Sequence, residues 1–323
     1  MNPLILKDLA ESFGLVPEKI TPVSGGWLNE KWRVQCAGAD VLVKQLSLTR
    51  YSEKGIREIE AALQRQLRLK DIPCPRLHCA GETIIRRLDE STAYLVMDFC
   101  EGYQPDRETV TPVQMRDLGR VLGKIHRQFD ALENVDTVRG YPFSGETILH
   151  ELREERTRRE ESLTTDAPKE LRRALEDWKR IADRLSAEYL DSLPRGVGHE
   201  DFTPDNMLFT NSGVAAIVDF DRNQYGFRFH DVGRALVSFA LEENGLNPEK
   251  TDAFLDGYSS QYPFDRTLLP DVLCAVWCVE APWWINEKTF ASENPKLQRF
   301  LKEMLWLTEV LFEDKVVCEN ERK

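Results

Sequence analysis

Residues 198–221 read GHEDFTPDNMLFTNSGVAAIVDFD. Two apolar runs in this stretch, MLF and VAAIV, are separated by NSG, which is typical of two short strands joined by a turn. Such a hairpin would place Asp201 and Asn206, which precede its first strand, beside Asp219, which ends its second strand. Amide and carboxylate oxygens are ligands of hard divalent cations, so Asn206 and Asp219 are candidate metal ligands. The carboxylate of Asp201 is then left to contact a hydroxyl.

These residue types at these intervals are typical of a phosphoryl-transfer site, where the protein positions the reactants and Mg²⁺ neutralises the phosphates. An ordinary polar loop followed by a surface hairpin is the alternative interpretation, because each residue type is common. His199 stands two residues before Asp201, which completes the pattern H-x-D-x-x-x-x-N followed by a strand-end Asp. This pattern resembles the catalytic and metal-binding loops of the protein-kinase-like superfamily. The form HED…N…VDFD is more similar to the aminoglycoside phosphotransferase and choline kinase branch than to the protein kinases, which would show H-R-D and D-F-G.

The resemblance covers roughly residues 23–236 and implies an α+β, bilobal, protein-kinase-like fold. It implies a small β-rich lobe at residues 1–101 that binds the nucleotide. A larger, mainly helical lobe at residues 102–323 would carry the catalytic loop and the substrate site, and Gly102 marks the passage between the two.

The same resemblance implies roles for the residues of the opening stretch, with ATP and Mg²⁺ as cofactors. Asp201 would orient the acceptor hydroxyl and accept its proton late in the transfer, and His199 would brace the catalytic loop. Asn206 and Asp219 would hold Mg²⁺. Glu200 departs from the family pattern, which commonly has a small or neutral residue there; it would either add negative charge that favours a cationic acceptor or face solvent.

Composition limits the classes of function. The 323 residues suffice for two lobes with a proper core, and 43 basic against 55 acidic residues give a net charge of −12. An acidic chain does not suggest a nucleic-acid binder. No apolar run approaches the roughly 20 residues that span a bilayer, and no signal peptide is recognisable. Seven cysteines without a C-x-x-C pair favour reduced thiols in a cytoplasmic protein, with no metal site formed by cysteine.

A glycine-rich turn lies between two predicted strands near the N-terminus, in the sequence VSGGWLNEKWRV. Glycines let the backbone approach a phosphate closely, although most such turns bind nothing. The segment GGWLN resembles the G-G-x-x-N nucleotide loop of the aminoglycoside phosphotransferase family. The resemblance assigns Gly25, Gly26 and Asn29 to nucleotide binding.

Lys44 ends the next predicted strand, at residues 41–44, where a lysine usually faces solvent. It resembles the lysine that contacts the α- and β-phosphates in the superfamily and pairs with a glutamate of the following helix. That helix is expected at residues 52–70. Its spacing from the motif IPCP favours Glu60 as the partner, with Glu58 as the alternative.

The segment AYLVMDFCEG, at residues 93–102, is a predicted strand that ends in a turn. It resembles the gatekeeper and hinge of the family, so Met97 would lie behind the adenine. The backbones of Asp98 and Cys100 would hydrogen-bond the base. A buried strand with no ligand is the alternative.

The rest of the chain is predicted to be helical, with helices at residues 111–129, 147–162 and 170–190. Asp231 stands at the expected start of a further helix and either caps it or, as the resemblance implies, braces the backbone of the catalytic loop. Tryptophans at 277, 283, 284 and 306 would fill a core or, with Glu280, hold a cationic head group.

The sequence therefore predicts a small-molecule kinase that transfers the γ-phosphoryl group of ATP to a hydroxyl of a small, cationic or neutral acceptor. The alternative is a non-catalytic protein that binds a nucleotide or a partner on the same fold. The absence of D-F-G and of an A-P-E segment argues against a protein acceptor. The sequence does not select among aminoglycosides, choline or ethanolamine, homoserine and sugars, and it does not determine the oligomeric state.

Overall fold

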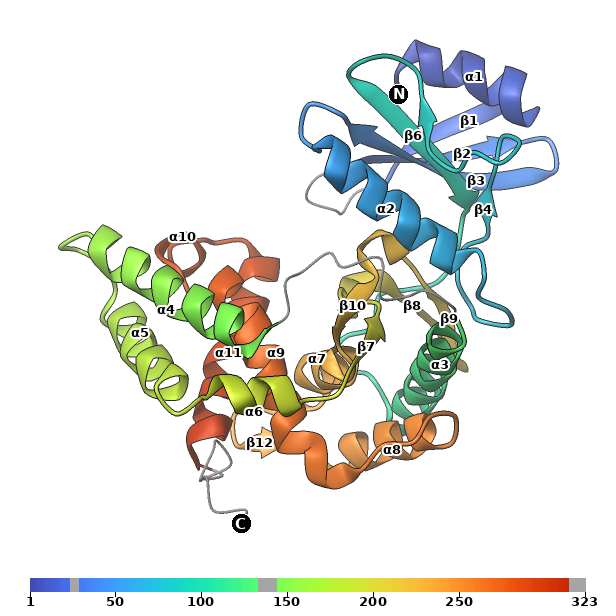
Figure 1. Cartoon of the computed structure of the whole chain (residues 1–323). Coiled ribbons are helices and arrows are strands. Elements are labelled where there is room, and N and C mark those ends of the chain that lie inside the picture. The colour runs from blue at the N-terminus through green and yellow to red at the C-terminus, as the bar shows by residue number, and fades with distance from the viewer. Residues whose placement is uncertain (24–28, 133–143, 314–323) are drawn as a thin grey trace. The chain divides into compact units, whose positions relative to one another are not determined.

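The computed structural model describes residues 1–23, 29–132 and 144–313 (Figure 1). Its contacts divide the chain into two compact units, each made of two segments. Unit 1 consists of Met1–Pro105 and Pro204–Asn223, and unit 2 consists of Asp106–Thr203 and Gln224–Lys323. The hairpin of the opening stretch thus packs with the N-terminal residues, and the lobe boundary after residue 101 stays a prediction.

Unit 1 is built on a mostly antiparallel six-stranded sheet with the order β1-β2-β3-β6-β4, in which β5 also pairs with β6. The strands are β1 (Pro17–Pro22), β2 (Glu30–Cys36), β3 (Ala39–Ser47), β4 (Leu77–His78), β5 (Arg86–Arg87) and β6 (Thr92–Asp98). Two helices, α1 (Pro3–Phe13) and α2 (Glu53–Gln66), belong to the same unit. Each is capped at its N-terminus by the side chain that precedes it, Asn2 for α1 and Ser52 for α2.

The alternation of side chains along β3 and β6 gives the sheet two apolar faces. Helices α1 and α2 lie on opposite sides of this sheet (Figure 1). One face packs on α1, where Ile5 and Leu9 contact a cluster that includes Val41, Val43 and Val96. The other face packs on α2, whose apolar side chains join Leu46, Leu95 and Met97. Lys44 has the same strand parity as Leu46 and is 3% exposed, so it is buried on the α2 face instead of facing solvent.

Unit 1 also contains the hairpin that the opening stretch predicted. Strands β8 (Met207–Thr210) and β9 (Gly213–Ile217) pair antiparallel, preceded by the 3₁₀ turn η2 (Pro204–Asn206) and followed by η3 (Phe220–Arg222). The backbone N–H of Ile217 donates to the Pro73 carbonyl at 2.7 Å, and that of Tyr103 donates to the Phe209 carbonyl at 3.0 Å. These bonds attach the hairpin to the rest of the unit.

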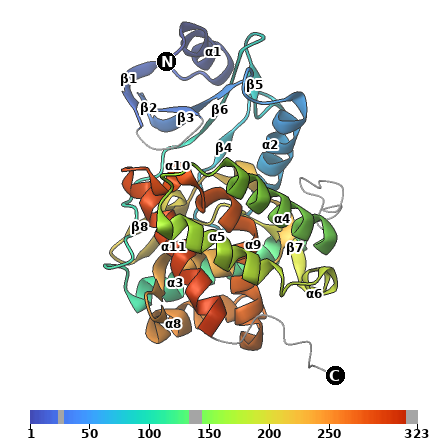
Figure 2. The ribbon, with the colours of Figure 1, turned by 90° about the vertical axis from the view of Figure 1, so that its left-hand side faces the viewer.

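Unit 2 is mainly helical, and its apolar core lies among α4, α5, α7, α9 and α11 (Figure 2). Trp178 and Trp277 meet edge to face in this core at 6.0 Å, and both are fully buried. The helices of the unit are α3 (Pro112–Asp130), α4 (Gly145–Ser162), α5 (Lys169–Ala182), α6 (Ala187–Ser192), α7 (His230–Phe239), α8 (Pro248–Ser259), α9 (Leu269–Trp284), α10 (Glu287–Phe290) and α11 (Pro295–Glu313). Two short strand pairs, β7 (Arg195–Gly198) with β10 (Gln224–Phe227) and β11 (Leu241–Glu242) with β12 (Gly245–Leu246), complete it.

The predicted fold class, a β-rich N-terminal region followed by a mainly helical one, is confirmed. The single helix predicted at residues 170–190 is wrong, because the chain forms α5 and α6 with a break between them. The Ser186 hydroxyl accepts a hydrogen bond from the backbone N–H of Tyr189 and so begins a new helix inside the periodic pattern. Among residues 1–23, 29–132 and 144–313, no helix is both long and apolar enough to cross a membrane.

Candidate active site

The hairpin brings the two predicted metal ligands to the same end of its strands. Asn206 is the last residue of η2, and the backbone N–H of Val218 donates to its carbonyl at 2.9 Å. Asp219 therefore follows directly on a residue that is bonded to Asn206. Its backbone is left-handed, with φ 67° and ψ 48°, a conformation that few residues other than glycine adopt but that Asp tolerates.

The ammonium group of Lys44 lies between the carboxylates of Asp219 and Asp221. Its Nζ is 2.5 Å from Asp219 Oδ1 and 2.6 Å from Asp221 Oδ2, and Lys31 Nζ is 3.1 Å from Asp219 Oδ2. Burial alone would lower the pKa of Lys44, but the two carboxylates raise it above its ordinary value. Burial likewise works against the ionised form of Asp219, yet Lys44 and Lys31 lower its pKa. The cluster is therefore a set of mutually compensating charges, of which Lys44 is buried and the others are partly buried.

Asp221 has the opposite shift from Asp219. Burial raises its pKa above the ordinary value, and the neighbouring Asp219 carboxylate adds to this, against the attraction of Lys44. Two carboxylates that share one ammonium cannot both be fully compensated. Asp219 is thus the more strongly anionic member of the pair.

Glu60, the predicted partner of Lys44, does not pair with it here. Within the described residues, the Nζ of Lys44 contacts Asp219 and Asp221, two carboxylates that the 219–221 turn directs to the same point. The alternative partner, Glu58, forms a 3.5 Å ion pair with Lys54 on the surface of α2. The assignment of Glu60 to the nucleotide site stays a prediction.

The remaining predicted nucleotide-binding residues lie in unit 1 or outside the described residues. Gly25 and Gly26 belong to residues 24–28, which the structure does not describe. Asn29 exchanges hydrogen bonds with the Tyr51 hydroxyl, with Nδ2 donating at 3.0 Å and Oδ1 accepting at 3.2 Å. It therefore connects the start of β2 to the segment that leads into α2.

The predicted hinge is the end of β6. Met97 is 6% exposed and packs on the α2 face, while the backbone N–H of Asp98 donates to the Arg76 carbonyl at 2.9 Å. The Asp98 carboxylate lies 2.6 Å from the Nε2 atom of His78. The backbone N–H of Cys100 forms no hydrogen bond within the part of the chain that the structure describes, and its role toward the base stays a prediction.

The predicted catalytic loop, residues 199–203, is held from one side by Asp231, the second residue of α7. The Asp231 carboxylate is fully buried and accepts from the backbone N–H of His199 at 2.6 Å and from that of Glu200 at 2.9 Å. His126 Nε2 lies 3.1 Å from the same carboxylate. Burial would raise the pKa of Asp231, but the hydrogen bond to His126 and the charges of the nearby histidines lower it to about 2. The predicted bracing of the loop backbone by Asp231 is confirmed.

The side chains of the loop have different environments. His199 is fully buried with its ring edge-on to Phe202 at 5.8 Å, which suits a structural role, whereas Asp201 is half-buried. Glu200 does not face solvent; its side chain is 6% exposed and lies 4.0 Å from His230 Nδ1. Burial, followed by the charges of Asp231 and Glu280, raises the pKa of Glu200 well above its ordinary value.

The donor set at the hairpin fits a hard divalent cation, which takes carboxylate, amide and phosphate oxygens. Asn206 supplies an amide, and Asp219 and Asp221 supply carboxylates. Across the described parts of the chain, no three or more His, Cys, Asp or Glu side chains gather as a metal site. A cation bound there would therefore need further oxygen ligands, such as those of nucleotide phosphates.

The comparisons with known proteins agree with this geometry. The profile of the phosphotransferase enzyme family (APH) matches residues 19–268, and the chain belongs to this family. A homoserine kinase of Agrobacterium fabrum is 27% identical over 232 residues, which are 69% of this chain and 67% of that protein. A homoserine kinase of Gluconobacter oxydans is 27% identical over 162 residues, about half of either chain (49% and 48%). The predicted family is thereby confirmed.

Solved structures confirm the predicted fold over almost the whole chain. Amicoumacin kinase in complex with AMP-PNP, Ca²⁺ and amicoumacin superposes with a TM-score of 0.67 at 14% identity, covering 95% of this chain and 93% of that one. An aminoglycoside phosphotransferase bound to ADP gives 0.60 at 14% identity, covering 96% and 99%. The microcompartment-associated aminopropanol kinase gives 0.61 at 13% identity, covering 98% and 99%.

Sequence reasoning missed three residues around Lys44. Asp221 was visible as the second Asp of VDFD but received no role, and Lys31 carried no signal at all. Asn223, which follows the turn, bonds to two residues of α2. Arg65 Nε donates to Asn223 Oδ1 at 2.5 Å, and Asn223 Nδ2 donates to the Ala62 carbonyl at 2.8 Å. These bonds fix α2 to the turn that carries Asp219, and nothing in the local sequence pattern predicts them.

Proposed function

We propose that the protein is an ATP- and Mg²⁺-dependent kinase that transfers a phosphoryl group to a hydroxyl of a small acceptor bearing an amino group. The observation that carries this proposal is the cluster in which Lys44, Asp219 and Asp221 meet at the end of the hairpin, next to Asn206. Membership in the phosphotransferase enzyme family supports the same reaction. The relatives named homoserine kinase support an acceptor that bears an amino group.

Each residue of the chain then has a defined task. Lys44 would contact the phosphates of ATP, with Glu60 as its partner in that state, and Asn206 and Asp219 would hold Mg²⁺. The bound metal would neutralise charge on the transferred phosphoryl group. The backbones of Asp98 and Cys100 would bind the adenine in front of Met97, and Gly25, Gly26 and Asn29 would line the phosphate loop.

Asp201 would orient the acceptor hydroxyl and take its proton as the new P–O bond forms. The loop backbone on its N-terminal side is fixed by Asp231, so Asp201 would be held by bonds that it does not make itself. His199 would contribute packing to this loop. We place the reaction in the cytoplasm, where ATP is available.

The test is Mg²⁺-dependent release of ADP by the purified protein against amino alcohols, hydroxylated amino acids, aminoglycosides and sugars. We expect turnover with an amino-bearing acceptor and its loss in Asp201→Asn. Asp166→Asn, which changes an exposed carboxylate of the same unit that forms no hydrogen bond or ion pair with any described residue, is the matched control and should keep full activity. ATP binding without turnover on any acceptor would favour the non-catalytic alternative, and absence of ATP binding would refute the kinase assignment.

A further inference from the structure

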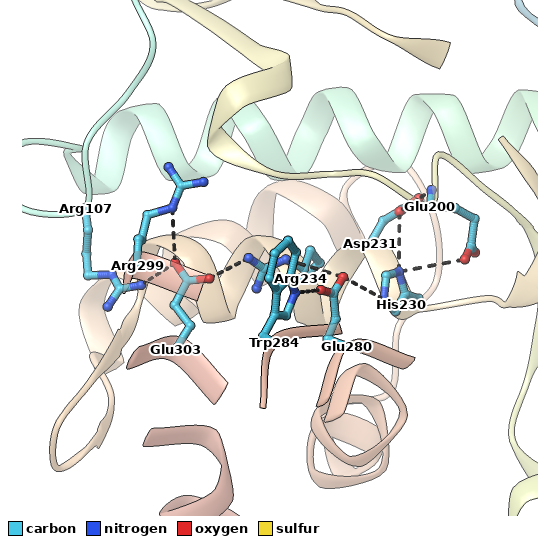
Figure 3. A network of polar contacts seen from close by, with 9 residues as sticks. All are labelled: Arg107, Glu200, His230, Asp231, Arg234, Glu280, Trp284, Arg299 and Glu303. Carbon is cyan, nitrogen blue, oxygen red and sulfur yellow. Dashed lines mark hydrogen bonds and ion pairs between the residues drawn. The ribbon is translucent and has the colours of Figure 1, made fainter. Parts of the chain in front are cut away.

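A series of charged side chains crosses unit 2 and ends beside the catalytic loop (Figure 3). It begins at Glu303, which is fully buried. The Glu303 carboxylate accepts hydrogen bonds from Arg107 Nη2 at 2.7 Å and from Arg234 Nη2 at 2.5 Å. It continues from Arg234 to Glu280 and from Glu280 to His230, each at 3.8 Å. Its last contact, at 4.0 Å, joins His230 to Glu200.

Arg234 is fully buried, yet it uses few of its five N–H donors. Its Nη2 donates to Glu303, but Nε and Nη1 form no hydrogen bond with any described residue. Both ring nitrogens of His230, which is 1% exposed, are likewise without a hydrogen-bond partner. Buried donors are almost always bonded in native proteins, and groups left over in one place indicate a site for a ligand with acceptor atoms.

Glu280 faces these donors with one oxygen only. Its Oε2 accepts from Trp284 Nε1 at 2.5 Å, while Oε1 stays 3.8 Å from both Arg234 Nε and His230 Nε2, beyond hydrogen-bond distance. Trp284 is itself fixed by stacking on Phe300, with ring centroids 4.2 Å apart and planes 7° apart. The carboxylate of Glu280 is therefore oriented, 13% exposed and left with an acceptor atom to offer.

The charges of the cluster are unequal at its two ends. At the Glu303 end, three arginines, Arg107, Arg234 and Arg299, surround that single carboxylate. At the other end, Arg234 is the one arginine or lysine within ion-pair distance of Glu280 among the described residues, and burial lowers the pKa of His230, which favours its neutral ring. A simple cation would neutralise Glu280 but would leave the positive charge of the arginines uncompensated. A ligand with one positive and one negative charge would compensate both Glu280 and the arginines.

Asp201 is the neighbour in sequence of Glu200, whose carboxylate lies 4.0 Å from His230 Nδ1 at the end of this cluster. A head group bound between Arg234 and Glu280 would thus sit near the proposed base, as a short acceptor requires.

We propose that Arg234 and Glu280 recognise the zwitterionic head group of a hydroxylated α-amino acid, with Arg234 donating to its carboxylate and Glu280 accepting from its ammonium. This inference rests on the proposed function, since it makes that amino acid the phosphoryl acceptor. It assigns Trp277 to the core and leaves Trp284 as a positioning residue for Glu280. It also distinguishes this site from one built for a simple amine.

The test measures binding separately from phosphoryl transfer. L-2-Aminobutyrate has the head group but no hydroxyl, propylamine lacks the carboxylate, and butyrate lacks the ammonium. We expect calorimetry on the wild type to give binding of L-2-aminobutyrate at least about tenfold tighter than binding of either truncated compound, the loss expected for one charge-assisted hydrogen bond. Equal binding of propylamine would overturn the role of Arg234, and equal binding of butyrate would overturn that of Glu280.

Glu280→Gln keeps an oxygen for Trp284 but removes the charge, and it should weaken L-2-aminobutyrate about tenfold or more. Glu309→Gln, at an exposed position of α11, is the matched control and should bind as the wild type does. Thermal unfolding of both variants checks that they fold. Unchanged affinity in a folded Glu280→Gln would overturn the inference. Normal binding of L-homoserine without phosphoryl transfer to it or to any other acceptor of the panel would instead refute the proposed function and leave the head-group site standing.

Discussion

Replacing Asp231 by Asn tests the support of the catalytic loop. The Asp231 carboxylate accepts three hydrogen bonds. Its Oδ2 atom accepts two of them, from the His199 backbone N–H at 2.6 Å and from His126 Nε2 at 3.1 Å. The other oxygen takes the Glu200 backbone at 2.9 Å. An amide keeps one oxygen, so at least one buried N–H loses its acceptor, which costs about 1–3 kcal/mol, and the remaining bonds lose their charge assistance. We expect the variant to be less stable by about 3 kcal/mol.

The assay is urea unfolding followed by tryptophan fluorescence, which reports mainly on unit 2 because Trp178, Trp277, Trp283, Trp284 and Trp306 lie there. With a slope of about 3 kcal/mol/M, the loss corresponds to a midpoint shift of about 1 M. Turnover should fall by about tenfold or more, because small displacements of a reacting group are costly. Asp166→Asn should change neither quantity. A wild-type midpoint for Asp231→Asn would refute the bracing role, even if activity were lost.

Two further predictions concern the acids of the site. Asp219→Asn should reduce Mg²⁺-dependent transfer by on the order of a hundredfold, because the charge that holds the metal is lost while Asn still tolerates the left-handed backbone. The measurement is steady-state turnover of the variant, with its melting temperature as the check that it folds as the wild type does. Undiminished activity would exclude Asp219 as a metal ligand. Glu200→Gln should flatten the pH dependence of stability. The raised pKa of Glu200 means that the folded state holds its proton more firmly, so this stabilisation is complete below the ordinary value of about 4.3 and is lost as pH rises through the folded value. Urea midpoints across that range should therefore fall more steeply with pH for the wild type than for Glu200→Gln, and parallel curves would contradict the shift.

The sequence predicted the parts of the fold that depend on local pattern. The hairpin around Asn206 and Asp219, and the helices α2 and α3, appear close to where the spacing of apolar and turn residues placed them. The break between α5 and α6 was missed because the apolar period continues through it. Periodicity reports which face of a helix is buried, but it does not reveal a capping serine that starts a second helix in the same phase.

The site was predictable where one residue type at one spacing defines the chemistry. Asp231 could be assigned a brace only through the family resemblance, because an acid at a helix start is equally able to cap that helix. The partner of Lys44 could not be assigned from sequence, since the sequence offers several acids, Glu58, Glu60 and Asp221. The conformation of the 219–221 turn determines which carboxylates contact the Lys44 ammonium group. Arg234 gave no signal, because an arginine inside an apolar helix carries no motif of its own.

The pattern of residue types also does not predict the left-handed backbone of Glu200 and of Asp219. Asp71, Glu200 and Asp219 are the non-glycine residues with positive φ in the described parts of the chain, at 55°, 63° and 67°. The left-handed turn at Glu200 belongs to the loop segment in which two successive N–H groups meet one carboxylate of Asp231. The turn at Asp219 aims its carboxylate at Lys44 and Lys31. Such conformations cost roughly 1–3 kcal/mol each and persist only where the surrounding bonds hold them. Bonds of this kind hold Glu200, which precedes Asp201, and Asp219, which follows a residue bonded to Asn206. The strain thus lies where the proposed reaction needs fixed oxygen atoms.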